Sequence, residues 1–367
     1  MNRSCLCSIL ITTALICGAY FIGNAYIDKE FKERLLRWKI TDKMHNATSN
    51  TCQNLNKPLG SEALPQGIIV KTSNLETQHL WNYCDSENVT EGNTNRSMSL
   101  LAMAFPLQDF VVMLFHYDGV LDDWNQYPWS AHALHVSVMN QTKWWFAKRF
   151  LHPDVVAEYE YIFLWDEDLG VGHFNPQRYL SIVKEEGLEI SQPGLDPTES
   201  EVYHPITARR EKLKVHRRIY KYKGGFRCDG NSTDPPCIGW VELMAPVFSR
   251  SAWRCSWYMI QNDLIHAWGL DVQLGYCAQG DRKKNVGVVD AEYIVHYGLP
   301  TLGGVVNASS SARNETNPKS GVSQDLSESD GVDNRGKVRM KSSVEMKRFK
   351  ERWKKAVKDD ICWVDPY

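Results

Sequence analysis

Short apolar runs alternate with segments of helical periodicity along most of the chain. The runs are rich in β-branched and aromatic residues and end at polar or turn-forming residues, so they predict buried strands. The predicted strands cover residues 67–70, 109–116, 161–165, 188–191, 239–248 and 286–297. Helical patterns cover residues 143–151, 154–159, 176–186, 249–260 and 268–278. This alternation predicts an α/β fold, with a sheet flanked by helices.

The predicted strand at 161–165 ends in three consecutive carboxylates, Asp166, Glu167 and Asp168. Ligands bind at the carboxyl ends of strands in open α/β sheets. Two aspartates one residue apart suit a hard cation such as Mg²⁺ or Mn²⁺, which prefers carboxylate oxygens. The alternative is a solvated acidic loop or a helix N-cap, because this short motif is a weak signal by itself.

Two other strand-associated carboxylates are candidates for the same site. Asp118 follows the second predicted strand in a turn signal, where it either contacts the ribose or base of a nucleotide or serves the turn itself. Glu242 lies inside an otherwise apolar predicted strand. A carboxylate in that position must be paired, ligated or protonated.

The last third of the chain supplies a carboxylate and a histidine. Asp271 opens a predicted helix after Trp268 and Gly269, where the helix N-terminus favours a charged carboxylate. It is either a functional group or an N-terminal cap. His296 ends the last predicted strand, and it is either structural or a partner of the earlier Asp-x-Asp.

The N-terminus predicts a membrane anchor. Residues 6–27 carry no charged side chain and are long enough to span a bilayer. We therefore predict a cytoplasmic tail at 1–5, a signal anchor at 6–27 and a polar stem at 28–66. A cleaved signal peptide is the alternative, since Gly23-Asn24-Ala25 would serve as its cleavage site. The positive-inside rule would place the body in the cytosol, because more Lys and Arg follow the span than precede it.

Glycosylation sequons and cysteines favour a lumenal body instead. Seven Asn-x-Ser/Thr sequons begin at Asn46, Asn88, Asn95, Asn140, Asn231, Asn307 and Asn314. Their excess indicates glycosylation. Seven cysteines follow the predicted span, and Cys228 with Cys237 is the first pair that we expect to form a disulfide. The net charge of −2 gives no electrostatic case for nucleic acid as a partner.

Composition divides the rest of the chain into three parts. The α/β domain is predicted at 67–304. Residues 305–340 are rich in Ser, Asn, Gly and Asp, which predicts a disordered linker. Residues 341–367 contain Phe349, Trp353 and Ala356 at helical spacing, so we expect an amphipathic helix that docks on the main domain.

The order of these elements resembles the GT-A glycosyltransferase fold, a mixed sheet flanked by helices. In that fold a nucleotide-sugar half ends in Asp-x-Asp, and an acceptor half ends in a strand with a late histidine. The resemblance implies that Asp166, Asp168 and His296 bind Mn²⁺ or Mg²⁺ on the donor diphosphate. It also implies a catalytic base at Asp271, with Glu242 as the second choice.

A more specific resemblance covers residues 58–367. The segments 115–119 (FHYDG), 162–169 (IFLWDEDL), 292–298 (EYIVHYG) and 363–367 (WVDPY) are similar to the plant family known as domain of unknown function 707. That family is single-pass and uncharacterised. The acidic triplet is followed by Leu169 and then by Gly170-Val171-Gly172, without a second signature motif.

Two functions are therefore predicted. The first is a Golgi-type, single-pass membrane glycosyltransferase that transfers a sugar from a nucleotide-sugar to a glycan or glycoprotein acceptor. The alternative is a non-catalytic lumenal glycan-binding or scaffold protein on a degenerate transferase fold.

Overall fold

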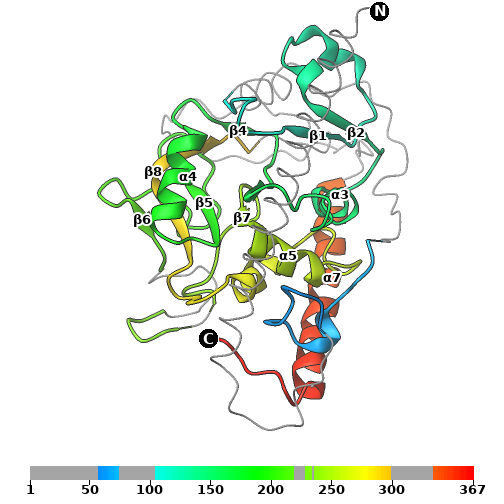
Figure 1. Ribbon diagram of the computed structural model, residues 1–367, viewed down its shortest axis with the longest axis vertical. Helices are drawn as coiled ribbons and strands as arrows, with labels where there is room; N and C mark the ends of the chain where they lie inside the picture. Colours follow the sequence, from blue (N-terminus) through cyan, green and yellow to red (C-terminus); the bar gives the residue numbers. More distant parts are fainter. Residues whose placement is uncertain (1–56, 74–103, 219–227, 234, 299–333) are drawn as a thin grey trace, which may run out of the picture. The chain divides into compact units, whose positions relative to one another are not determined.

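The computed structural model describes residues 57–73, 104–218, 228–233, 235–298 and 334–367 (Figure 1). The predicted span at 6–27, the stem up to residue 56 and the linker up to residue 333 lie outside the described residues, as do five of the seven sequons. Within the described ranges, no helix has the length and apolar character needed to cross a membrane.

A six-stranded mixed sheet organises the main body. Its strands follow the order β3-β7-β5-β8-β4, and β6 also pairs with β8. Strands β5 and β8 are parallel, and the other neighbours are antiparallel. The bounds are β3 Tyr161–Phe163, β4 Leu169–Gly170, β5 Ile190–Leu195, β6 Val215–His216, β7 Val247–Ser249 and β8 Val286–His296.

A separate parallel pair is formed by β1 (Met113–His116) and β2 (Leu134–Ser137). The 3₁₀ helices η2 (Asp122–Gln126) and η3 (Ser130–His132) connect these strands. The connection at residues 117–133 is long enough for a crossover between parallel strands, but it carries two 3₁₀ helices in place of the usual α-helix.

Five α-helices are present among the described residues. They are α3 Lys143–Phe150, α4 Pro176–Glu185, α5 Arg250–Met259, α6 Leu270–Gln273 and α7 Asn334–Asp359, with 3₁₀ helices η1 Gln66–Ile68 and η4 Leu274–Cys277. Side chains cap three of them at the N-terminus. Thr142, Asn175 and Ser249 accept backbone N–H groups from the first turns of α3, α4 and α5. The mixed α/β class is confirmed.

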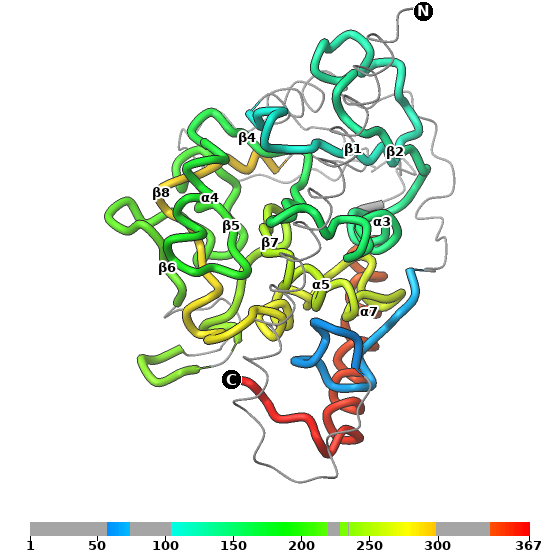
Figure 2. Tube along the Cα trace, in the orientation of Figure 1, coloured from blue at the N-terminus to red at the C-terminus, as the bar shows by residue number. Residues whose placement is uncertain are grey.

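The C-terminal helix α7 packs into the main hydrophobic core. Phe349 and Ala356 are 1% and 3% exposed and belong to the same cluster as Trp253 in α5. Figure 2 shows α7, in red, beside the blue segment 57–73. Asp360, just after α7, accepts a hydrogen bond from the Gln66 N–H at 2.8 Å, and Lys57 pairs with the same carboxylate at 3.2 Å.

Two disulfides join described residues. Cys228 pairs with Cys237, as predicted, and Cys255 in α5 pairs with Cys277 in η4. Cys255 and Cys277 are both fully buried.

Some predicted elements are wrong. Of the strand predicted at 239–248 only the end forms a ladder, as β7, and residues 154–159 form turns rather than a helix. The strand predicted at 67–70 does not form, because this segment includes the end of η1. Helix α7 begins at Asn334, inside the linker predicted at 305–340. Trp240 and Val241 are nonetheless buried. A short apolar run indicates that a segment is buried, but burial alone does not show that the segment is a strand.

Candidate functional site

Strand pairing brings the acidic triplet to His296. Strand β4 pairs antiparallel with the end of β8, so that Leu169 lies opposite His296. The Tyr297 N–H donates to the Asp168 carbonyl at 3.0 Å. As a result the Asp168 Oδ2 lies 3.3 Å from His296 Nε2, and both side chains are buried.

The hydrogen bonds of His296 determine its protonation. Its Nδ1 lies 2.9 Å from the Glu201 carbonyl, which can only accept, so Nδ1 carries a proton. Nε2 then faces a carboxylate and needs either a second proton or a cation. Burial lowers the pKa of His296, but the hydrogen bonds to Asp168 and Glu201 outweigh burial and raise it to about 9. The raised pKa favours a protonated His296 at neutral pH, beside Asp168.

Asp166 is paired with a lysine that the sequence did not suggest. Lys143 is the first residue of α3, and its ammonium group pairs with Asp166 and donates to the Leu243 carbonyl at 2.6 Å. Burial raises the pKa of Asp166, and Lys143 opposes that shift. A cation at a helix N-terminus is unfavourable with the helix dipole. This mismatch is the sequence signal that would have indicated an anionic partner.

Tyr117 reaches the middle carboxylate of the triplet. Its hydroxyl donates to Glu167 Oε1 at 3.0 Å, which links the end of β1 to the end of β3. Burial raises the pKa of Glu167 to about 7, and the neighbouring Asp166 charge adds to this. Asp118, the next residue after Tyr117, is exposed and accepts the Val120 N–H at 3.0 Å within its own turn.

Glu242 lies in the irregular segment before β7. Its backbone N–H donates a hydrogen bond to the side-chain oxygen of Gln192. Its Oε1 is 4.0 Å from His204 Nε2, and its buried Oε2 has no hydrogen-bond partner within the described ranges. Burial raises the pKa of Glu242 to about 8; His296 opposes the shift, while Asp271 and Asp166 add to it. Glu242 therefore interacts electrostatically with His296, Asp271 and Asp166.

Asp271 lies in the first turn of α6, whose N-cap Gly269 adopts a left-handed φ of +87°. Its Oδ1 accepts the Val272 N–H at 3.0 Å, and burial raises the pKa of Asp271 to about 6.

Helix α7 holds the loop that leads to Asp271. Glu345 accepts from the N–H and the ring of His266, at 3.1 and 2.8 Å. Arg352 forms two hydrogen bonds of 2.7 Å to Asp263. A Cβ on Gly269 would lie only 2.9 Å from Met346 Cγ, so the glycine permits this close approach. The last helix of the chain therefore positions the candidate base.

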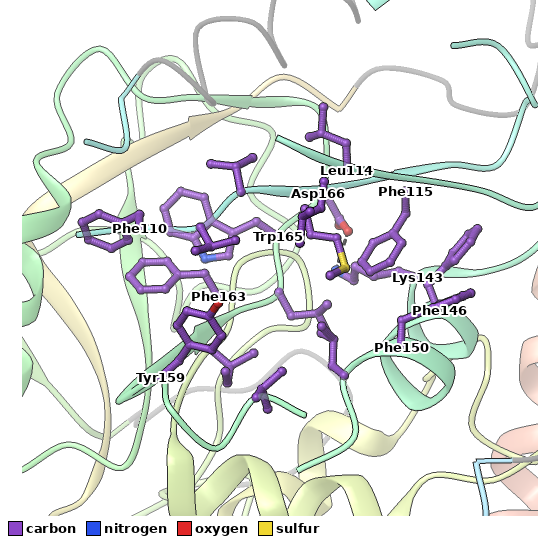
Figure 3. Close-up of a pocket in the computed structure, with 18 of the residues that line it drawn as sticks. Phe110, Leu114, Phe115, Lys143, Phe146, Phe150, Tyr159, Phe163, Trp165 and Asp166 are labelled. Atoms are coloured by element: carbon purple, nitrogen blue, oxygen red, sulfur yellow. Dashed lines mark hydrogen bonds and ion pairs between the residues drawn. The ribbon is translucent and has the colours of Figure 1, made fainter. Parts of the chain in front are cut away.

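A cavity of about 850 Å³ adjoins the acidic triplet. Figure 3 shows Lys143 and Asp166 at this cavity together with aromatic rings from β1, β3 and α3. The lining is mostly apolar and has few polar groups, which is typical of small-molecule sites. The sequence could not indicate it, because its walls come from strands of two different sheets.

No group of three His, Cys, Asp or Glu side chains is arranged as a metal site in the described part of the chain. The donor chemistry nevertheless fits a divalent cation. Asp166 and Asp168 offer hard oxygens, and His296 already donates Nδ1–H to a backbone carbonyl, as metal-binding imidazoles commonly do. Asp166 is paired with Lys143 and Asp168 with His296, so a bound cation would have to compete with these two ion pairs.

The fold and site define a mixed α/β protein in which carboxylates and a histidine converge at strand ends. A comparison with protein-family models matches residues 55–359 to the family described as "Protein of unknown function (DUF707)". The chain belongs to this family, as its motifs predicted. Neither the curated proteins nor the solved structures contain a match to it.

The buried Glu242 predicts an unusual dependence of stability on pH. The pKa of its carboxyl group is about 8 in the folded protein and near 4.5 in the unfolded chain, so the folded state keeps the carboxyl proton up to a higher pH. As pH rises from about 5 to 8, the stability of the Glu242→Gln variant relative to the wild type should therefore increase by about 3–4 kcal/mol. Urea unfolding at several pH values measures this difference. The exposed Glu211→Gln is the control, and a constant difference across pH would contradict the prediction.

Proposed function

We propose that this protein is a membrane-anchored, lumenal glycosyltransferase that uses a divalent cation and a nucleotide-sugar, with a glycan or glycoprotein as acceptor. The observation that carries the proposal is that strand pairing brings Asp168 to His296, with Asp166 next to Asp168 in the acidic triplet, while Glu242 interacts electrostatically with Asp166, His296 and Asp271. A large cavity adjoins the same carboxylates.

The residues supply the groups that such a reaction needs. Asp166, Asp168 and His296 would hold the cation, which when bound neutralises charge on the diphosphate. Lys143 places a second positive charge beside Asp166. Asp271 accepts the proton of the acceptor hydroxyl as the acceptor oxygen attacks the anomeric carbon and the nucleoside diphosphate leaves. A carboxyl pKa of about 6 suits this role, because the group is ionised yet still basic at neutral pH.

Two features support a lumenal location. The buried Cys255–Cys277 disulfide is typical of an oxidising compartment. Asn231, which begins one of the sequons, is exposed in the loop that the Cys228–Cys237 disulfide closes. An exposed loop is the position that glycosylation requires.

A thermal-shift screen tests the proposal. The detergent-solubilised full-length protein is combined with Mn²⁺ or Mg²⁺ and with UDP, GDP or CMP. We expect one nucleotide to raise the melting temperature only with the cation, because a ligand that binds the folded state stabilises it. At a ligand concentration 100 times Kd the gain is about 2.7 kcal/mol. Asp166→Asn should abolish this gain and Asp118→Asn, in an exposed turn, should retain it.

The two ion pairs also favour a second candidate, a non-catalytic glycan-binding protein. Lys143 with Asp166 and His296 with Asp168 neutralise the carboxylates without any cation. This candidate predicts glycan binding with no nucleotide-dependent shift. A cation-dependent shift that Asp166→Asn removes would exclude it.

A further inference from the structure

The exposed side of α7 carries a concentrated positive charge. The helix from Arg339 to Asp359 contains nine Lys or Arg residues and three Asp or Glu residues, whereas the whole chain has a net charge of −2. Of the three acids, Glu345 is buried against His266, Asp359 is paired with Lys355, and Glu351 is exposed between Lys347 and Lys354. The basic residues therefore dominate the outer surface of this helix.

Four of these residues form a stripe, which we call the α7 lysine stripe: Lys347, Lys350, Lys354 and Lys358. All four are exposed. At about 100° per residue they fall within about 80° of the helix circumference, opposite the buried Phe349 and Ala356. None of the four donates a hydrogen bond or forms an ion pair to a residue that the structure describes.

A stripe of this kind is unfavourable for the helix alone. Successive members are three or four residues apart, and like charges at that spacing repel each other. Glu351 is the one acidic residue interleaved with these four lysines, so their mutual repulsion is only partly offset within the helix. An anionic ligand along the stripe would relieve the repulsion.

The stripe lies beside the candidate base. Lys350 is close enough to Asp271 to lower its pKa electrostatically, although burial has the larger and opposite effect. Met346, one turn before Lys350, contacts the Gly269 position at the start of α6. A chain bound along the stripe would therefore pass the carboxylate that accepts the acceptor proton.

We infer that the acceptor is an acidic polysaccharide, a linear glycan that carries a carboxylate on its sugars, and that the α7 lysine stripe binds it. The role of this polysaccharide as the acceptor rests on the proposed function. The charge pattern by itself specifies only the class of ligand. Regularly spaced carboxylates complement regularly spaced lysines, whereas a neutral glycan gains nothing from them.

The test measures binding of fluorescent oligogalacturonate to the detergent-solubilised full-length protein by anisotropy. We expect binding that weakens as salt rises, because exposed charges are screened. A neutral oligosaccharide of the same length should not bind. The double variant K347E/K354E should weaken binding by about tenfold or more. The matched control K212E/K283E, which reverses two exposed lysines elsewhere, should bind like the wild type.

Three results would overturn the inference. The first is an equal loss of oligogalacturonate binding in both double variants. The second is binding of the neutral oligosaccharide as tight as that of oligogalacturonate. The third is tighter binding to vesicles of phosphatidylcholine and phosphatidylserine than to oligogalacturonate.

Failure of this inference can be distinguished from failure of the transferase proposal. A nucleotide shift without uronate binding removes only this inference. Uronate binding without a nucleotide shift keeps the ligand class and favours the glycan-binding protein.

Discussion

Replacing Asp271 with asparagine should lower the rate of sugar transfer by about 10²- to 10⁴-fold, the usual contribution of a general base. Cation-dependent nucleotide binding should remain, because Asp271 lies in α6 and the cation candidates lie at the ends of β3 and β8. In the wild type, kcat/KM should rise with pH through about 6 as Asp271 loses its proton. Transfer assays between pH 5 and 8, with the nucleotide identified by the thermal-shift screen, measure both effects.

The matched variant for this experiment is Glu242→Gln, which removes the other buried carboxylate of the cluster. If Asp271 is the base, Glu242→Gln should retain most of the transfer rate. If Asp271→Asn instead keeps more than about a tenth of the rate, the assignment of the base is wrong. Glu242 would then be the better candidate, and the wild-type pH profile should rise nearer to pH 8.

Replacing Phe349 with alanine should lower the free energy of unfolding by about 3–5 kcal/mol, as is typical for a buried phenylalanine. Phe349 is 1% exposed and joins α7 to the core around Trp253. The same change should loosen the contacts of Glu345 and Arg352 with the loop before Asp271. Urea unfolding measures the stability, and hydrogen exchange of residues 263–271 measures the loop.

The control for Phe349→Ala is Met340→Ala on the same helix. Met340 is 67% exposed, so its truncation should change stability by about 0.5 kcal/mol or less. Equal effects of the two variants would show that α7 does not contribute to the core.

Local pattern was sufficient to predict much of the fold. The apolar runs at β1, β3 and β8 and the helices α3, α4 and α5 depend on short-range periodicity, which the sequence displays directly. The predicted pairing of Cys228 with Cys237 followed from their loop, and it is also confirmed.

Features that depend on contacts between distant segments were missed. Lys143 meets Asp166 and Leu243 because α3 begins beside the end of β3. A cation at a helix N-terminus indicates an anionic partner but does not identify it. The segment around Trp240 is buried by packing rather than by strand pairing, so its apolar pattern predicted a strand that does not form. The role of α7 in holding the loop before Asp271 was missed for the same reason.

The Cys255–Cys277 disulfide closes a covalent ring around the loop that carries Asp263, His266 and Asp271. Both cysteines and the loop leave the ribosome before α7, because chains are synthesised from the N-terminus. The ring can therefore close while the partners of that loop, Glu345 and Arg352, have not yet been made. Docking of α7 is then the last step in the maturation of this region, so a chain truncated before residue 334 should reach an oxidised state that still lacks an ordered Asp271 loop.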